Sequence, residues 1–187
     1  FLKQIEDLIL PSKLYDFSKR NRELLLKSFN TNDKNLGVLL EGDKGTGKTM
    51  DAKMLCKELT IPKILITKKI PKNIDYISFL QSIEQSFVLY IDEFEKLFKS
   101  YDDNDDNYHV QDSLLTILDG LNNAYKKLFI FTSNSKVSSY FINRPSRIKY
   151  HIKYQGILEE NAKIIIMDLL QNKDLGEDLL KNIDLHS

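Results

Sequence analysis

The sequence lacks the features that mark secreted and membrane proteins. Its 187 residues include one cysteine, Cys56, so no disulfide can form within the chain, and we expect a reducing, cytoplasmic compartment. No apolar run approaches the ~20 residues that a membrane-spanning helix needs, and no signal peptide is visible. Because the chain begins with Phe1 rather than methionine, we expect it to be a piece of a longer protein.

An excess of charge of one sign is also missing. The 27 basic and 27 acidic residues cancel, so no global field attracts nucleic acid or a membrane, and such binding would need a local patch. Arginine is scarce, and the four arginines are Arg20, Arg22, Arg144 and Arg147. The length suffices for one domain with a hydrophobic core.

Residues 42–49 read Gly-x-x-x-x-Gly-Lys-Thr, between an apolar run at 36–41 and a helical pattern that follows. A glycine-rich turn between strand and helix points backbone N–H groups into one hollow, where the helix N-terminus favours phosphates. A chance match is the alternative, but strand, loop and helix all agree with the mechanism. We therefore expect ATP to be bound by Gly42, Asp43, Lys44, Gly45, Thr46, Gly47, Lys48, Thr49 and Met50.

Apolar runs alternate with helical patterns along the chain. Strands are predicted at 36–41, 63–67, 87–91, 128–132 and 148–153. Helices are predicted at 12–29, 47–59, 74–85, 110–122, 158–171 and 175–183. The strand interiors are continuously apolar, as in a parallel sheet that helices cover on both faces, so the sequence predicts an α/β fold.

A second apolar run, Phe87–Ile91, ends in the carboxylates Asp92 and Glu93. Open parallel sheets bind ligands at the carboxyl ends of their strands. We expect Asp92 and the Thr49 hydroxyl to hold Mg²⁺, and Glu93 to orient and deprotonate the attacking water. An acidic pair at a helix N-terminus is the alternative interpretation.

Two further polar groups extend this pattern. Asn134 follows the strand predicted at 128–132 and could hold the lytic water with Glu93, or be a turn residue. Arg144 and Arg147 lie three residues apart, and a planar guanidinium suits a transferring phosphoryl group, which an arginine from a neighbouring subunit can stabilise. A surface Arg-Pro turn with salt bridges is the alternative there.

The phosphate loop, the acidic pair, the strand before Asn134 and the arginine segment are four motifs. In this order and spacing they resemble the AAA+ ATPases, and their details resemble the AAA clade. Residues 111–121 are similar to the clade's helix ending in Leu-Asp-Gly, and 131–134 to its sensor-1 strand. Residues 144–148 are similar to its Arg-Pro-Gly-Arg segment, with Ser146 in place of glycine. The resemblance covers residues 11–185, and the spacing is most like the ATPases that assemble the mitochondrial bc-type respiratory complex.

The resemblance implies a P-loop NTPase three-layer αβα sandwich, with a parallel five-stranded sheet of order 5-1-4-3-2. Residues 1–155 would form the large subdomain and 156–187 part of a helical lid. It also implies a homo-oligomeric, hexamer-like ring with nucleotide between subunits. Within one subunit the acting residues would be Lys48, Thr49, Asp92, Glu93 and Asn134, whereas Arg144 and Arg147 would serve the neighbour's nucleotide.

The sequence departs from many AAA unfoldases after its second predicted strand. The segment 68–73 has three lysines, Lys68, Lys69 and Lys72, but no aromatic residue or glycine, and 102–106 is acidic. We expect a ring ATPase that remodels a protein or protein complex. A DNA-transaction ATPase, with the three lysines along a phosphate path, is the first alternative, and a nucleotide-gated scaffold with little hydrolysis is the second.

Overall fold

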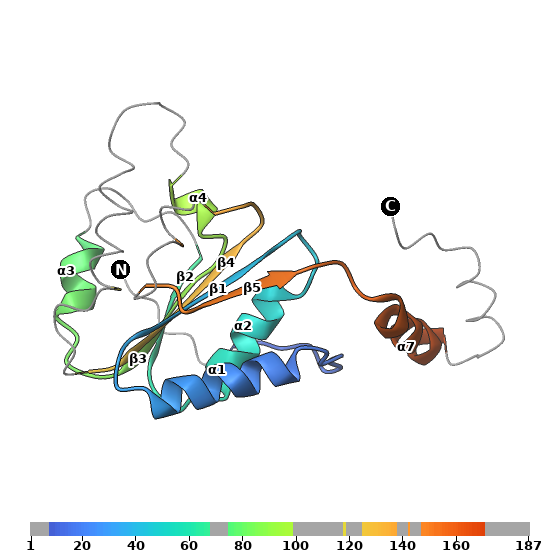
Figure 1. The fold of residues 1–187 in the computed structure, drawn as a ribbon, viewed down its shortest axis with the longest axis horizontal. Coiled ribbons are helices and arrows are strands. Elements are labelled where there is room, and N and C mark those ends of the chain that lie inside the picture. The colour runs from blue at the N-terminus through green and yellow to red at the C-terminus, as the bar shows by residue number, and fades with distance from the viewer. Residues whose placement is uncertain are drawn as a thin grey trace.

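The structure of the chain is a computed structural model that describes residues 8–67, 75–98, 118, 125–137, 142 and 147–170. The elements follow one another as α1 (Lys19–Thr31), β1 (Leu36–Gly42), α2 (Lys48–Lys57), β2 (Lys63–Ile66), α3 (Tyr76–Gln81), β3 (Phe87–Ile91), α4 (Glu95–Phe98), β4 (Lys127–Ser133), β5 (Tyr150–Tyr154) and α7 (Glu159–Leu170) (Figure 1). No helix among these residues is long and apolar enough to cross a membrane.

The strands form one five-stranded sheet of order β2-β3-β4-β1-β5, and every neighbouring pair is parallel. Read from the other edge this is the predicted order 5-1-4-3-2, so that prediction is confirmed. Because all strands run the same way, β1, β3 and β4 end at the same edge of the sheet. The polar residues that follow these three strands are thereby brought together.

The two faces of the sheet bury different cores, because side chains alternate along each strand. In β1, Val38 and Leu40 pack with residues of α1 and α2, whereas Leu39 packs on the other side with Leu80 of α3. Figure 1 shows α1 and α2 together below the sheet and α3 away from them. The result is the expected αβα layering, with both faces of the central strands fully buried.

The first helix begins later than its pattern predicts, at Lys19 rather than at residue 12. Residues 8–18 form no helix, and we call them the N-terminal strap. Tertiary contacts hold the strap in place: Asp16 pairs with Arg22 of α1, and Tyr15 bonds to Asp168 of α7. These contacts compete with the local helical pattern of the strap, and no local pattern could reveal them.

Several predicted features lie outside the described residues. They are the basic segment 68–73, the acidic segment 102–106, Arg144 and the helix at 175–183. Of the helix predicted at 110–122 only Leu118 is described, and it is helical and buried. The short helix α4, directly after the carboxylates of β3, has no counterpart among the predicted elements.

Candidate active site

The phosphate loop joins β1 to α2 and depends on glycine at two positions. Gly45 has φ 83° and Gly47, the N-cap of α2, has φ 95°, a left-handed backbone that strains residues with a Cβ. No described atom lies within 4 Å of the place that a Cβ would occupy at either position. The backbone of the loop is therefore open toward an anion at the positive end of α2.

Lys48 lies folded into this loop. Its ammonium donates hydrogen bonds of 2.6 Å to the carbonyl oxygens of Gly42 and Asp43, and the residue is buried. Burial lowers the pKa of Lys48, although nearby carboxylates such as Glu95 oppose the shift. The Lys48 ammonium also donates a longer bond of 3.4 Å to Thr46 Oγ1. Lys48 thus provides a poorly hydrated cation at the hollow, and its neutral oxygen partners can be replaced by phosphate oxygens.

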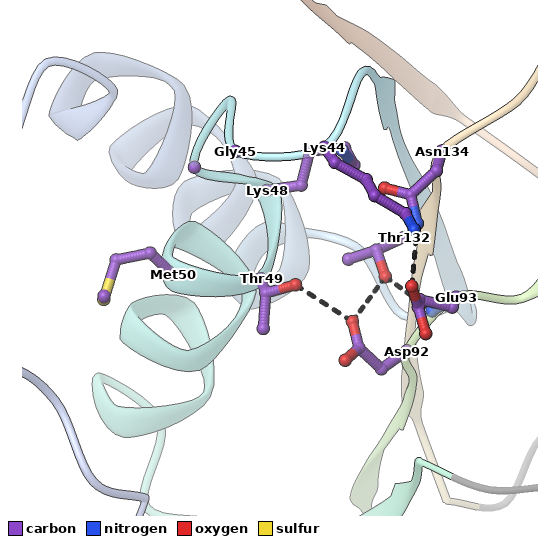
Figure 2. Close-up of a pocket in the computed structure, with 10 residues that line it drawn as sticks. Lys44, Gly45, Lys48, Thr49, Met50, Asp92, Glu93, Thr132 and Asn134 are labelled. Carbon is purple, nitrogen blue, oxygen red and sulfur yellow. Dashed lines mark hydrogen bonds between the residues drawn. The ribbon is translucent and has the colours of Figure 1, made fainter.

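Asp92, the residue after β3, collects hydroxyl donors on one carboxylate oxygen. Its Oδ1 accepts from Thr49 Oγ1 at 3.1 Å and from Thr132 Oγ1 at 2.7 Å (Figure 2). It also accepts from Tyr90 Oη at 2.8 Å. A hydroxyl beside a carboxylate is a hard oxygen donor set of the kind that Mg²⁺ prefers. Among the described residues, no group of three or more His, Cys, Asp or Glu side chains is arranged to hold a metal ion without other ligands.

Glu93 occupies a backbone conformation that is unusual for a residue other than glycine. Its φ is 50°, and left-handed residues of this type cost about 1–3 kcal/mol unless their surroundings impose them. Thr132 of β4 imposes it here: Thr132 Oγ1 accepts from the Glu93 N–H at 2.9 Å and its carbonyl accepts from the Phe94 N–H at 2.8 Å. Neighbouring strands therefore fix the direction of the Glu93 side chain.

The carboxylate of Glu93 meets two donors. Asn134 Nδ2 donates to Glu93 Oε1 over 2.9 Å, and the Lys96 ammonium pairs with Glu93 Oε2. Glu95 accepts from the Asn134 N–H at 3.1 Å and so fixes the start of the loop after β4. The carboxylate is oriented at the pocket wall, where a water could give it a proton.

These groups line one pocket of about 480 Å³. The lining residues are Lys44, Gly45, Gly47, Lys48, Thr49, Met50, Asp92, Glu93, Thr132 and Asn134. The structure thus brings together the residues that the sequence predicts to act within one subunit. Gly42 and Asp43 lie just behind, bonded to Lys48.

The sequence interpretation missed Tyr90 and Thr132. The pairing register of β3 and β4 could have revealed Thr132. Ile91 pairs with Phe131, so the next residues, Asp92 and Thr132, lie side by side. Tyr90 is two residues before Asp92 and faces the same way. Burial raises the pKa of the Tyr90 phenol and the Asp92 charge adds to the shift, so this hydroxyl remains a donor at neutral pH.

A second cavity, of about 510 Å³, adjoins the first and shares Gly45, Gly47 and Met50 with it. Its walls are the strap, the end of β5 and the start of α7, with Thr46 at the phosphate loop. Four large apolar side chains on these walls are 38–64% exposed: Leu14, Phe17, Ile157 and Leu158. The cavity offers apolar surface beside the phosphate loop, and no motif in the sequence indicates it.

The two arginines predicted to act on a neighbour differ. Arg144 lies outside the described residues, whereas Arg147 is buried at 6% exposure. Arg147 precedes β5 beside the start of β1, where the Lys149 N–H bonds to the Gly37 carbonyl. The phosphate loop follows the other end of β1, so the structure does not bring Arg147 to the pocket of its own chain. Its role toward a neighbour stays a prediction.

A parallel sheet of this order, with a glycine-rich phosphate loop at its carboxyl edge, defines a P-loop nucleotide-binding α/β domain. The family model of the ATPase family associated with various cellular activities (AAA) matches residues 38–156, more than half of the chain. The chain therefore belongs to this family and is an ATPase of the AAA+ type. A search of the curated proteins found no match.

Proposed function

We propose that this chain is a Mg²⁺-dependent ATP-hydrolysing module that assembles into a ring and uses ATP turnover to remodel a protein or protein complex. The observation that carries the proposal is the pair of carboxylates in one pocket: Asp92 beside the Thr49 hydroxyl, and Glu93 beside Asn134. In this proposal one acid holds the metal and the other activates water, which is the division that hydrolysis of the ATP phosphoanhydride needs.

The residues of the pocket divide the work as follows. Lys48 exchanges its loop carbonyls for β- and γ-phosphate oxygens, and the open backbone of the loop binds the remaining phosphate charge. Thr49 and Asp92 would hold Mg²⁺, which supplies charge neutralisation at the phosphates when bound. Glu93 takes a proton from the attacking water, and Asn134 keeps the Glu93 carboxylate in position.

The second cavity would take the nucleoside. A ligand whose phosphates lie on the loop at Gly45 and Gly47 extends directly into it, because both cavities share those residues. The exposed apolar side chains there, such as Leu14 and Ile157, would be covered by a base. Most ligand sites combine apolar walls with a few placed polar groups, and this cavity has that character.

The ring and its substrate rest on the family resemblance and on the sequence. In the proposed ring, Arg144 reaches the nucleotide of the next subunit. We favour a protein as the remodelled partner, as in the complex-assembly ATPases that the chain resembles, because the net charge is zero. Stimulation of turnover by DNA rather than by protein, in a titration of both, would favour the nucleic-acid alternative instead.

The site assignment is tested with Glu93→Gln. The amide has the same shape but accepts no proton, so ATP binding should persist while turnover falls about 10²- to 10⁴-fold. Glu84→Gln, an exposed change distant from the pocket, is the matched control and should hydrolyse ATP as the wild type does. Binding is measured by calorimetry and turnover by phosphate release, each with Mg²⁺ and with EDTA. Retained turnover in Glu93→Gln would show that another group activates water.

A further inference from the structure

Arg22 of α1 is a buried charge that the proposed chemistry does not use. The side chain is 4% exposed and contacts three carboxylates. Its Nη1 donates to Asp16 Oδ1 at 2.8 Å and to Asp51 Oδ1 at 2.9 Å, and its Nε donates to Glu58 Oε1 at 3.1 Å. Buried charges persist only when they are paired, so this guanidinium holds three parts of the chain together.

Two of those parts border the second cavity. Asp16 belongs to the N-terminal strap, and Asp51 lies in the first turn of α2, two residues after Thr49. The phenol of Tyr154, at the end of β5, donates to the other oxygen of Asp51 at 2.5 Å. Asp51 and Tyr154 both line the cavity. Arg22 and its three carboxylate partners, which we call the Arg22 hub, therefore connect the strap to the helix that starts at the phosphate loop.

The strap is held at a second place. Tyr15 and Lys13 both contact Asp168 of α7, the helix on the opposite wall of the cavity. In Figure 1 the strap leaves the start of α1 and extends toward α7. Both of these contacts are exposed to water, whereas Arg22 is buried, so the firmer attachment is the one to Arg22.

The chemistry of the hub favours a fixed strap. The Arg22 guanidinium lowers the pKa of the Asp16 carboxyl, so this carboxylate is ionised at neutral pH and remains a strong acceptor. The planar fork of arginine serves several carboxylates at defined angles, which a lysine could not do. A strap without helix or strand of its own thus has one rigid anchor beside the cavity.

We propose that the Asp16–Arg22 pair is a positioning device that fixes the strap as the nucleoside-facing wall of the site. It rests on the proposed function, in which the second cavity takes the nucleoside. Releasing the strap should then weaken binding of the nucleoside part of the ligand and spare the triphosphate part, because the phosphate loop does not depend on Asp16. Neither residue is a catalytic residue in this arrangement.

The test compares two variants that each remove one carboxylate from the same guanidinium. Asp16→Asn frees the strap, whereas Glu58→Gln, at the far end of α2 and outside the cavity, leaves the strap attached. Each full chain is titrated with ATP and with inorganic tripolyphosphate in Mg²⁺ by calorimetry. Asp16→Asn should weaken ATP about tenfold, the loss expected for one charge-assisted hydrogen bond, and leave tripolyphosphate unchanged. Glu58→Gln should change neither.

Three outcomes would overturn the positioning role: equal losses for ATP and tripolyphosphate in Asp16→Asn, no loss at all, or the same loss in Glu58→Gln. If the wild type itself binds ATP no more tightly than tripolyphosphate, the nucleoside assignment of the cavity fails instead. Amide hydrogen exchange provides a second measurement, and Asp16→Asn should speed exchange in residues 8–18 only. Should Asp16→Asn not fold, Asp168→Asn releases the same strap at its exposed and weaker α7 end, and a smaller loss is expected for ATP but none for tripolyphosphate. An equal loss for both ligands would overturn the strap as the nucleoside-facing wall.

Discussion

The phosphate pocket lies beside the second cavity, which we propose takes the nucleoside, and the two are built differently. The pocket is lined by polar groups at the ends of β3 and β4 and at the start of α2, and the strands behind it are fully buried. The cavity combines half-exposed apolar side chains, on the strap and just before α7, with polar residues such as Lys153 and Asn161. In the proposed function, chemistry is thus placed on the buried sheet, and nucleoside recognition is placed on peripheral segments.

This difference has a physical reason. Phosphoryl transfer needs groups held within fractions of an ångström, and only buried strands with fixed register supply such precision. Nucleoside binding needs apolar area and tolerates segments that order around the ligand. In this chain the hydroxyl groups around Asp92 meet the first requirement, and the salt-bridged strap meets the second.

The largest expected effect concerns whether the phosphate pocket is complete within one chain. Arg144→Ala should reduce turnover about 10³-fold while ATP binding persists, because a lost arginine finger costs about that much. Lys48→Ala should lose tight nucleotide binding. Mixing the two variants creates interfaces with one intact loop and one intact arginine, so part of the activity should return. A mixture that stays inactive, although each variant assembles with wild type, would confine the site to one chain.

Arg147 gives this experiment an internal comparison. Arg147 is buried, so Arg147→Ala should also lower the melting temperature. Recovery of activity when Arg147→Ala is mixed with Lys48→Ala would show that Arg147 acts in trans despite its burial in the single chain. If no activity returns, Arg147 has a structural role in its own chain and does not act on the neighbour's nucleotide.

How far the sequence could predict this site follows from the same contrast. The loop 42–49, Asp92–Glu93 and Asn134 stand in short motifs after apolar strands, so local pattern and strand order were enough to bring them together. Thr132 needed the register of β3 on β4, which the sequence does not state. The strap needed the contact of Asp16 with Arg22 across the start of α1, and the contacts of Lys13 and Tyr15 with the distant Asp168. Neither set of contacts has a sequence pattern. A helical pattern was therefore extended over the strap wrongly.

A smaller effect is expected from Thr132, which serves both carboxylates. Thr132→Val keeps the shape but removes the donor to Asp92 and the acceptor for the Glu93 N–H. Losing hydrogen bonds to charged groups should lower turnover about 10- to 100-fold and raise the Mg²⁺ concentration needed for half-maximal activity. Thr132→Ser should restore both, and Tyr76→Phe, on the other face of the sheet, should change neither. A change in stability alone, without a shifted Mg²⁺ requirement, would make Thr132 a core residue only.

The smallest expected effect tests the cavity itself. Ile157 is 52% exposed on the cavity wall, so truncating it should leave stability within about 0.5 kcal/mol of the wild type. A base that covers this side chain loses part of its apolar contact in Ile157→Ala, and ATP should bind about three- to tenfold more weakly. Tripolyphosphate should bind as before, because the phosphate loop is untouched. Leu169→Ala, a similar loss on α7 outside the cavity, is the control and should alter neither ligand. An equal loss of both ligands in Ile157→Ala would mean that the cavity supports the phosphate loop and takes no base, and the contrast between the two regions would then disappear.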